Sequence, residues 1–464
     1  MQGFLISATR RSSGKTTVAV GLCRALKNRG LEPAPFKKGP DYIDPMWLGL
    51  SAGAPCVNLD FNTMTEREIA RRFARHCKGR KMAVLEGNMG LFDGMDPAGR
   101  DSNAELARQL GLPVILVVDC RGMTRGIAPL LLGYAAFDPE INLAGVVLNN
   151  VGGSRHESKL RAAVREYTDL PVVGAMARQA HLTIPERHLG LATSGEDDNA
   201  DRHVEAIASA VESALDIETL IRIANRHRIR LASAGREGVP SGAEGIRLGI
   251  ARDRAFSFYY PDDIADMEDA GIDLVGFSPV DDAGLPDVDA LLIGGGFPEM
   301  HAARLQTNAS MREAVLDFCR SGRPVYAECG GLMYLGRSLG WRGRSYRMAG
   351  YFQFDTVMQD RPVGRGYVQL APMPGHPWHD GRAADGEMSG APVRAHEFHH
   401  SSVQGMEGDI DYAWRIVRGH GIDGRHDGFV RQGVLAGFSH FRNTRSYPWI
   451  EHFTRYIRQR PVCH

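Results

Sequence analysis

One cysteine of this chain, Cys329, stands where a nucleophile could be held. The apolar run 323–327 before it is typical of a buried strand of a parallel sheet, and two glycines and an apolar segment of helical period follow it. At such a strand-to-helix turn the thiol lies in a tight bend, and the helix N-terminus favours the nucleophilic thiolate. Because an isolated Cys is more often an inert buried side chain, the rest of the chain has to decide between the two interpretations.

Three glycines upstream could serve the same site. Residues 294–296 are all Gly and directly follow the apolar run 290–293, which is typical of another buried strand. Backbone N–H groups with no side chain in front of them can face a ligand, as an oxyanion hole requires. We therefore expect Gly295, Gly296 and Gly330 to face a ligand and to stabilise a developing oxyanion.

A second group of residues could bind a nucleotide. The short apolar strand 3–8 leads into a loop that ends in Gly-Lys-Thr, and a helix follows over about 18–28. This is the phosphate-binding P-loop arrangement, in which Lys15 would reach the terminal phosphates and Thr16 would bind Mg²⁺. The pattern is imperfect, because Thr9 stands where the first Gly is expected. The residues expected to bind the nucleotide are Ser13, Gly14, Lys15, Thr16, Thr17 and Asn149.

Polar side chains also follow the ends of other predicted strands. Glu86 ends the apolar run 82–85, and ligands of parallel α/β sheets bind at the carboxyl ends of strands. Glu86 is therefore either a Mg²⁺ or substrate-facing carboxylate or a solvated acid at a strand end. Asn149 ends the run 143–150 and could meet the nucleotide base or cap a turn. Segment 35–45 follows a second strand and is interpreted as a rigid polar loop that includes Asp41.

The elements that must position these residues alternate between apolar strands and helical segments. This order predicts an α/β protein with mostly parallel sheets covered on both faces. A chain of 464 residues exceeds a single core, so we expect two domains of about 200 residues each. The segment 231–244 is rich in Ala, Gly, Ser and Pro without apolar period, which places the domains at 1–230 and 246–464 with a linker over 231–245.

Composition excludes several classes of function. Lys+Arg and Asp+Glu are both 55, so no net charge favours nucleic acid or an anionic membrane as a partner. The seven Cys form no C-x-x-C pair, which argues against a zinc site or a disulfide framework. No apolar run approaches the ~20 residues of a membrane span, and the chain starts directly with a strand. We expect a cytoplasmic protein with reduced thiols.

Nine motifs together resemble the cobyrinic acid a,c-diamide synthase family, in its order and over nearly the whole chain. The motifs of the first half are 14–17 (GKTT), 39–45 (GPDYIDP), 58–60 (NLD), 86–94 (EGNMGLFDG) and 185–191 (PERHLGL). Those of the second half are 255–261 (AFSFYYP), 294–299 (GGGFPE), 326–331 (YAECGG) and 396–399 (HEFH). The resemblance implies an N-terminal P-loop domain of the dethiobiotin-synthetase type and a C-terminal flavodoxin-like class I glutaminase domain.

The family's chemistry implies roles for particular residues. Cys329 would attack the glutamine amide with His440 as its base, and the family is described as having no firmly placed third acid. The released ammonia would displace phosphate from a substrate carboxylate that ATP and Mg²⁺ have converted to an acyl phosphate. Asp41 and Asp93 match catalytic acids of that site, and the implied metal ligands are Thr16, Asp41 and Glu86. Glutamine and a tetrapyrrole are the implied partners, and a homodimer stays open. Gly295, Gly296 and Gly330 are the residues implied to contact glutamine.

The tetrapyrrole is expected to contact Tyr42, Ile43, Trp47 and Leu48. The sequence departs from the family in this region at Met46-Trp47-Leu48 and at Lys37-Lys38. Together with Lys37-Lys38, the Trp47-Leu48 pattern is closer to the relatives that amidate sirohaem for dissimilatory sulfite reductase. The macrocycle is therefore open between a corrinoid (cobyrinate or hydrogenobyrinate), sirohaem and nickel-sirohydrochlorin. A second departure is Arg10, which stands five residues before Lys15 and is either a further phosphate contact or a solvated loop residue.

Two functions of other classes were weighed against this one. A non-enzymatic P-loop ATPase switch with an inactive glutaminase-like domain would need neither Cys329 nor the three glycines. A cysteine hydrolase without a synthetase role would leave Lys15 and Glu86 unexplained. His399 and His400 point to opposite faces if they share a strand, so we do not expect them to chelate one metal ion. The remaining cysteines are expected in the core.

Overall fold

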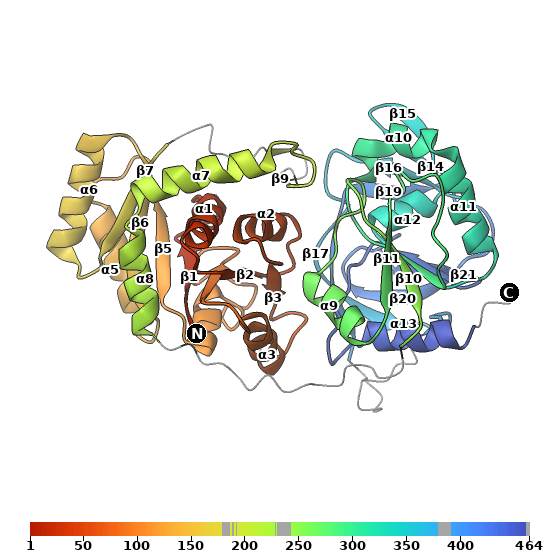
Figure 1. The fold of residues 1–464 in the computed structure, drawn as a ribbon, viewed down its shortest axis with the longest axis horizontal. Coiled ribbons are helices and arrows are strands. Elements are labelled where there is room, and N and C mark those ends of the chain that lie inside the picture. The colour runs from red at the N-terminus through yellow and green to blue at the C-terminus, as the bar shows by residue number, and fades with distance from the viewer. Residues whose placement is uncertain are drawn as a thin grey trace. The chain divides into compact units, whose positions relative to one another are not determined.

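The computed structural model describes residues 1–178, 186–187, 190–191, 193–227, 229, 243–378 and 391–460. The chain divides into two compact units, Met1–Gly235 and Arg236–His464, which Figure 1 shows in red to yellow-green and in green to blue. Residues 231–242 of the predicted linker and residues 185, 188 and 189 of the motif 185–191 lie outside the described residues. In the part of the chain that is described, no helix is both long and apolar enough to cross a membrane.

The N-terminal unit is built on a seven-stranded parallel sheet with the strand order β3-β2-β4-β1-β5-β6-β7. The strands are β1 (Gln2–Ala8), β2 (Pro33–Lys38), β3 (Val57–Leu59), β4 (Met82–Glu86), β5 (Val114–Asp119), β6 (Leu143–Val151) and β7 (Val172–Ala177). The helices are α1 (Lys15–Asn28), α2 (Ile43–Ala52), α3 (Glu66–His76), α4 (Asn103–Leu110), α5 (Ile127–Phe137), α6 (Ser154–Tyr167), α7 (Ala200–Ala214) and α8 (Ile217–Arg226). A short pair, β8 (Glu186–Arg187) and β9 (Gly190–Leu191), is antiparallel.

Helices cover both faces of this sheet. Successive residues of a strand point to opposite faces, so Phe4 and Ile6 of β1 pack with α1, α2, α7 and α8, whereas Leu5 packs with α3 to α6. Both faces of β1 are therefore buried, which explains why the strand has no polar alternation. The central strand then ends at the P-loop.

One predicted segment differs from the structure. The region after residue 200 forms two helices, α7 and α8, because Asp216 accepts a hydrogen bond from the Thr219 N–H (2.9 Å) and caps the second helix. The prediction of a loop over 35–45 was wrong at both ends. Residues up to Lys38 belong to β2, and α2 begins at Ile43 after the Asp41 carboxylate accepts the Ile43 N–H (2.9 Å).

The C-terminal unit has a nine-stranded mixed sheet in the order β11-β10-β12-β13-β22-β21-β20-β17-β18. Its parallel half is β10 (Arg247–Ala251), β11 (Asp273–Phe277), β12 (Ala290–Ile293), β13 (Val325–Glu328) and β22 (Val434–Gly437). The antiparallel half is β17 (Gly364–Pro372), β18 (Val393–His399), β20 (Asp411–Arg418) and β21 (His426–Arg431). The sequence analysis predicted the parallel strands of this sheet but not the antiparallel strands.

A four-stranded sheet and several helices complete this unit. The sheet has the order β15-β14-β16-β19, with β14 (Ser338–Trp341), β15 (Arg344–Arg347), β16 (Asp355–Met358) and β19 (Ser401–Gln404). The helices are α9 (Pro261–Asp269), η2 (Pro298–His301), α10 (Ala302–Thr307), α11 (Ala309–Arg320), α12 (Gly330–Leu335) and α13 (Trp449–Arg458).

Replacing Trp47 by Ala tests whether α2 is a core helix. The indole is fully buried and packs edge-on against His203 of α7, with ring centroids 5.8 Å apart. We expect the free energy of unfolding of the N-terminal unit to fall by about 3–5 kcal/mol. Met46→Ala, at the partly exposed neighbouring position, should cost less than about 1 kcal/mol. Urea denaturation measures both changes, and equal small losses would place Trp47 outside the core.

Candidate active sites

Cys329 stands at a strained strand-to-helix turn. It follows β13 directly and precedes α12, and its backbone has φ 48° and ψ −97°. A positive φ is uncommon for a residue other than Gly and persists only where the surroundings enforce it. The Cys329 N–H donates to the Gly437 carbonyl of β22 at 2.7 Å, which holds the turn in place. This is the geometry of a nucleophile elbow.

His440 lies beside Cys329 because their strands are neighbours. β13 and β22 are parallel and pair Glu328 with Gly437, and His440 follows three residues later. Burial alone would lower the pKa of His440, but its side-chain hydrogen bonds to Cys329 and to Glu328 raise it to about 10. The imidazolium form is therefore favoured, and it can stabilise a thiolate on Cys329.

Glu328 is a residue of this site that the sequence analysis missed. Its Oε2 accepts the His440 Nδ1–H at 3.2 Å, and its Oε1 accepts the Tyr326 hydroxyl at 2.6 Å and the Phe441 N–H at 3.2 Å. The position of Glu328 directly before Cys329 in the YAECGG motif was the available signal for this role. It was not decisive, because consecutive residues of a strand normally point to opposite faces.

The three predicted glycines surround the same point. A Cβ on Gly295 would stand 2.6 Å from His440 Cε1, and one on Gly330 would stand 3.2 Å from the Gly296 nitrogen. Gly296 has φ 156°, and a Cβ there would stand 2.0 Å from the Ala255 carbonyl oxygen. A side chain at Gly295 would therefore collide with His440, and one at Gly296 would collide with the Ala255 backbone. The neighbouring Gly294 N–H donates to the Tyr259 hydroxyl at 2.8 Å.

The P-loop connects β1 with α1. Gly14 caps α1 with φ 87°, and the Ser13 hydroxyl donates to the Arg10 carbonyl at 2.9 Å. The amide of Asn149, at the end of β6, donates to the Ser13 carbonyl at 2.8 Å. Asn149 therefore contacts the P-loop backbone itself. Thr17 lies half-buried in the first turn of α1.

Arg10 is engaged away from Lys15. Its guanidinium donates to the Asp119 carboxylate at 2.6 Å, at the end of β5. Asp119 also accepts hydrogen bonds from Arg121 and Asn150. Burial would raise the pKa of Asp119, yet the hydrogen bonds from Arg121, Asn150 and Arg10 lower it. The anion thus holds Arg10 at the rim of the P-loop.

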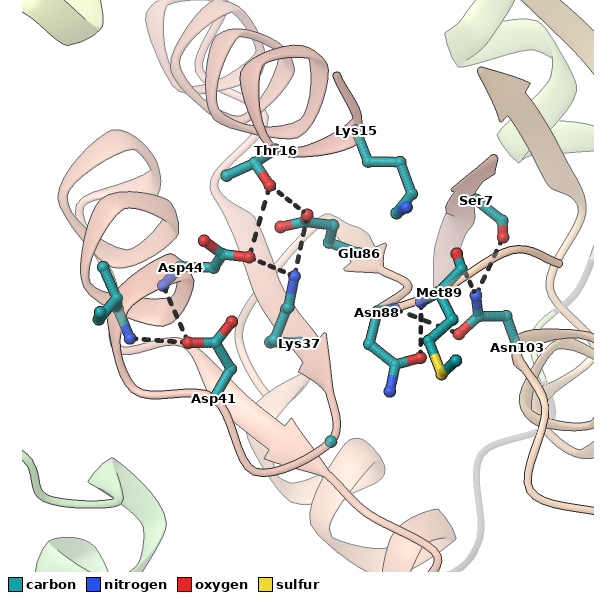
Figure 2. A network of polar contacts seen from close by, with 12 residues as sticks. Ser7, Lys15, Thr16, Lys37, Asp41, Asp44, Glu86, Asn88, Met89 and Asn103 are labelled. Carbon is teal, nitrogen blue, oxygen red and sulfur yellow. Dashed lines mark hydrogen bonds and ion pairs between the residues drawn. The ribbon is translucent and has the colours of Figure 1, made fainter. Parts of the chain in front are cut away.

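A cluster of oxygen atoms and one ammonium group lies behind the P-loop, as Figure 2 shows. The Thr16 hydroxyl donates to Glu86 Oε1 at 2.7 Å and lies 3.4 Å from Asp44 Oδ2. Lys37 Nζ contacts Asp44 Oδ2 at 2.5 Å and Glu86 Oε1 at 2.9 Å. The second oxygen of Glu86, Oε2, is buried without a described hydrogen-bond partner. An acceptor of this kind could bind a cation.

The charged side chains in this cluster shift one another's pKa values. Burial alone would lower the pKa of Lys37, but Asp44 and Glu86 raise it above its ordinary value. Burial would raise the pKa of Asp44, but Lys37 lowers it. Burial and the charge of Asp44 raise the pKa of Asp41 to about 7. Lys15 is buried too, and burial lowers its pKa to about 8 although Glu86 opposes the shift.

The structure thus brings Thr16 and Glu86 together with Asp44 and Lys37, which the sequence analysis had not assigned. Asp41, the predicted metal ligand, accepts backbone N–H groups at the start of α2. The signal for Asp44 was present in the GPDYIDP motif, but spacing alone did not show which acid faces Thr16. Lys37 is the residue before the end of β2, and its role depends on its contacts with Asp44 of α2 and Glu86 of β4.

Asp93 lies in the loop after β4. Its exposed carboxylate accepts the Gly90 N–H at 3.2 Å, and no described contact joins it to the Thr16–Glu86 cluster. Asn103, which is fully buried, fixes this loop by donating to the carbonyls of Met89 (3.2 Å) and Gly90 (3.0 Å) (Figure 2). The loop that holds Asp93 is therefore anchored to α4.

The residues predicted to meet the tetrapyrrole are mostly inside the protein. Trp47 and Leu48 have no exposed surface and belong to the core between α1, α2 and α7, so they cannot present a surface to a ligand here. Tyr42 is 8% exposed, and Ile43 is half-buried at the start of α2. Lys38 is buried as well, and its Nζ donates to Asn88 Oδ1 at 3.3 Å.

Comparisons with known proteins agree with both sites. Residues 4–191 match the CobQ/CobB/MinD/ParA nucleotide binding domain, and residues 247–446 match the CobB/CobQ-like glutamine amidotransferase domain. A cobyrinate a,c-diamide synthase of Magnetococcus marinus is 41% identical over 462 residues, with 98% of this chain and 97% of the relative covered. The chain belongs to the cobyrinate a,c-diamide synthase family.

Other members of this family are similar over comparable lengths. A cobyrinate a,c-diamide synthase of Syntrophotalea carbinolica is 40% identical, with 94% of each chain covered. A hydrogenobyrinate a,c-diamide synthase of Brucella anthropi is 39% identical, with 95% of this chain and 98% of the relative covered. The resemblance inferred from the motifs and the α/β fold class are both confirmed, and the protein is an enzyme of this amidotransferase family.

Replacing Lys37 by Met should destabilise the protein in a pH-dependent way. The change leaves Asp44 and Glu86 buried without their cation, which costs about 3–5 kcal/mol at pH 7. Without Lys37 these carboxyl groups avoid charge only by binding protons, so their pKa values rise. The loss should therefore be smallest near the ordinary carboxyl pKa of about 4 and should grow towards neutral pH.

Lys38→Met is the matched control for this prediction. Lys38 is also buried, but burial lowers its pKa and it donates to an amide oxygen rather than to a carboxylate. We expect little loss of stability and little pH dependence from its removal. Denaturation at several pH values compares the two variants, and a pH-independent loss for Lys37→Met would contradict the charge compensation.

Proposed function

We propose that this protein amidates the a and c acetate carboxylates of a cobyrinate-type tetrapyrrole, using ATP and glutamine. The main support is the combination in one chain of the Cys329–His440 pair with the P-loop cluster around Lys15. A relative of the same organisation, 41% identical, is named for this reaction. An ATPase switch would not need the strained thiol, and a simple hydrolase would not need the P-loop.

In the glutaminase half, the Cys329 thiolate attacks the carbonyl carbon of the glutamine side chain. Gly295, Gly296 and Gly330 leave backbone room beside the oxygen that becomes negative, and N–H groups at the start of α12 lack intrahelical partners. The C–N bond breaks as the His440 imidazolium gives its proton to the leaving nitrogen, and ammonia forms. Water then cleaves the thioester, which releases glutamate and restores the thiol.

In the synthetase half, a carboxylate oxygen of the substrate attacks the γ-phosphorus of ATP and ADP leaves. Lys15 neutralises charge on the transferred phosphoryl group, and the α1 N-terminus contacts the phosphates. Ammonia then attacks the acyl phosphate carbon and phosphate leaves, so that each amide consumes one ATP and one glutamine. Asp41 and Asp93 are proposed to act near the reacting carboxylate.

The cluster around Thr16 fits a Mg²⁺ ion. Mg²⁺ prefers oxygen ligands and is usually held by one or two carboxylates together with substrate phosphates and water. The Thr16 hydroxyl and the unpartnered Oε2 of Glu86 would hold it, with Asp44 or Asp41 as a further carboxylate. When bound, the ion would neutralise charge on the β- and γ-phosphates.

Cobyrinate is preferred over sirohaem as the substrate. The pattern that favoured sirohaem consists of Lys37-Lys38 and Trp47-Leu48, and all four side chains are buried. The pattern therefore reflects packing and charge compensation inside the unit. Incubation with ATP, glutamine and each of cobyrinate, sirohaem and nickel-sirohydrochlorin, followed by mass spectrometry, identifies which one gains amides. Amidation of sirohaem alone would contradict the proposed substrate.

Two substitutions should separate the two halves of the reaction. Cys329→Ser should lose glutamine-driven amide formation by at least about 1000-fold and keep synthesis from free ammonia. Lys15→Ala should lose synthesis from either nitrogen source, because the phosphoryl group is no longer neutralised. Cys319→Ser, which changes a buried thiol of α11, should keep both activities and is the control. Glutamine-driven synthesis retained by Cys329→Ser would contradict the role of Cys329.

A further inference from the structure

We propose that Glu328 is a positioning residue that orients His440 towards Cys329 for glutamine hydrolysis. The proposal rests on the glutaminase role proposed above and adds a third residue to the Cys–His pair. Glu328 is 8% exposed and comes directly before the nucleophile, at the end of β13. It would touch neither glutamine nor ammonia, and it would act through the imidazole ring.

The hydrogen bonds of Glu328 determine which ring nitrogen of His440 meets the thiol. A histidine ring has two nitrogens, and the contact made by one decides the proton state of the other. Glu328 Oε2 accepts from Nδ1 at 3.2 Å, so Nδ1 holds a proton and Nε2 is left to exchange a proton with Cys329. A His–carboxylate contact of this kind orients the base in hydrolases that use a nucleophile and a His.

The carboxylate itself has little freedom to move. The Tyr326 hydroxyl (2.6 Å) and the Phe441 N–H (3.2 Å) both donate to Oε1, which leaves Oε2 to face the ring. Phe441 directly follows His440, so the same side chain contacts both the ring and the backbone of the His segment. On the other side, the His440 N–H donates to the His396 carbonyl at 2.7 Å, and the His440 carbonyl accepts the His396 N–H at 3.1 Å. The His440 backbone is thereby held by β18, and its ring is held by Glu328 of β13.

The strained turn explains how two consecutive residues can serve one imidazole. In a regular strand, the side chains of Glu328 and Cys329 would point to opposite faces. The chain leaves the strand at Cys329 with φ 48°, and Glu328 lies in register with Gly437, three residues before His440. The thiol and the carboxylate therefore both reach the His440 ring.

Glu328 is the carboxyl group that contacts the His440 ring. Cys329 and Glu328 contact the His440 ring, and the His396 ring stacks on it at 6.4 Å. Burial lowers the pKa of His396 to about 3, so His396 is neutral. Tyr326, Tyr259 and Tyr447 face Glu328, and burial raises the pKa of each phenol, so they are neutral too. When Cys329 is acylated, Glu328 still contacts the His440 ring.

Glu328→Gln keeps the shape and removes the charge. We expect kcat for glutamate release to fall about 100-fold, with a much smaller change in KM for glutamine, because the base rather than the binding site is altered. The alkaline limb of the pH profile reports loss of the His440 proton, and it should move to lower pH by about one unit or more. Synthesis from free ammonia should stay at the level of the unchanged enzyme.

Asp427→Asn is the control for a purely structural effect. Asp427 is fully buried and accepts the N–H groups of Gly428, Phe438 and Ser439, so it anchors the same segment at a different point. Its replacement should lower the melting temperature, while the position of the alkaline limb stays unchanged. An equal shift of the limb in both variants would mean that any damage to this segment produces it, and the positioning role would be overturned.

The outcomes distinguish this proposal from the proposed function. If Cys329→Ser still releases glutamate, the glutaminase assignment itself fails. If Cys329→Ser is inactive but Glu328→Gln has the rate and pH profile of the unchanged enzyme, only the positioning role fails. If Glu328→Gln does not fold, Glu328→Asp decides, because its shorter side chain keeps the charge and loses the contact with Nδ1. An Asp variant with unchanged kcat would overturn the proposal.

Discussion

Both candidate sites depend on one constraint, which is that neighbouring parallel strands end at a common edge of a sheet. Each strand stops there, and the residues that follow are not needed for ladder hydrogen bonds. In the N-terminal unit, the edge joins the P-loop after β1 with Glu86 of β4. In the C-terminal unit, it joins Cys329 after β13 with His440 after β22. Thr16 and Glu86, 70 positions apart, thus come into contact, and so do Cys329 and His440, 111 positions apart.

The two sites also share the need to hold charge away from water. A buried charge is costly unless an opposite charge and hydrogen bonds compensate it. Around the P-loop, one ammonium group lies between two carboxylates, and a hydroxyl bonds one of them. In the glutaminase unit, one imidazole lies between a thiol and a carboxylate. In both, the groups that compensate the charge also hold the charged side chain in place.

Much of the fold and part of each site could be predicted from the sequence. Cys329 and the P-loop were recognisable because their chemistry is local, in that one turn and its flanking glycines define them. The same holds for Glu86, which ends an apolar strand. Asp44 and Lys37 were missed because a helix replaced the predicted loop, and the first turn of that helix turns Asp44 towards Thr16. Trp47 and Leu48 were misplaced for the same reason, since helical periodicity turns them into the core.

The sequence by itself determined the chemical groups, their order along the chain and the strands that end beside them. Apolar runs, glycines and motif residues can be recognised within a single segment of the sequence, because the structural preferences that they indicate are local. The tertiary structure alone decided which of several nearby polar side chains reach a reacting group. Whether Glu328 meets His440, or Asp44 rather than Asp41 meets Thr16, depends on a strained turn, a helix start and the register of strands far apart in the chain. These are set by packing across the whole unit, which no short segment encodes.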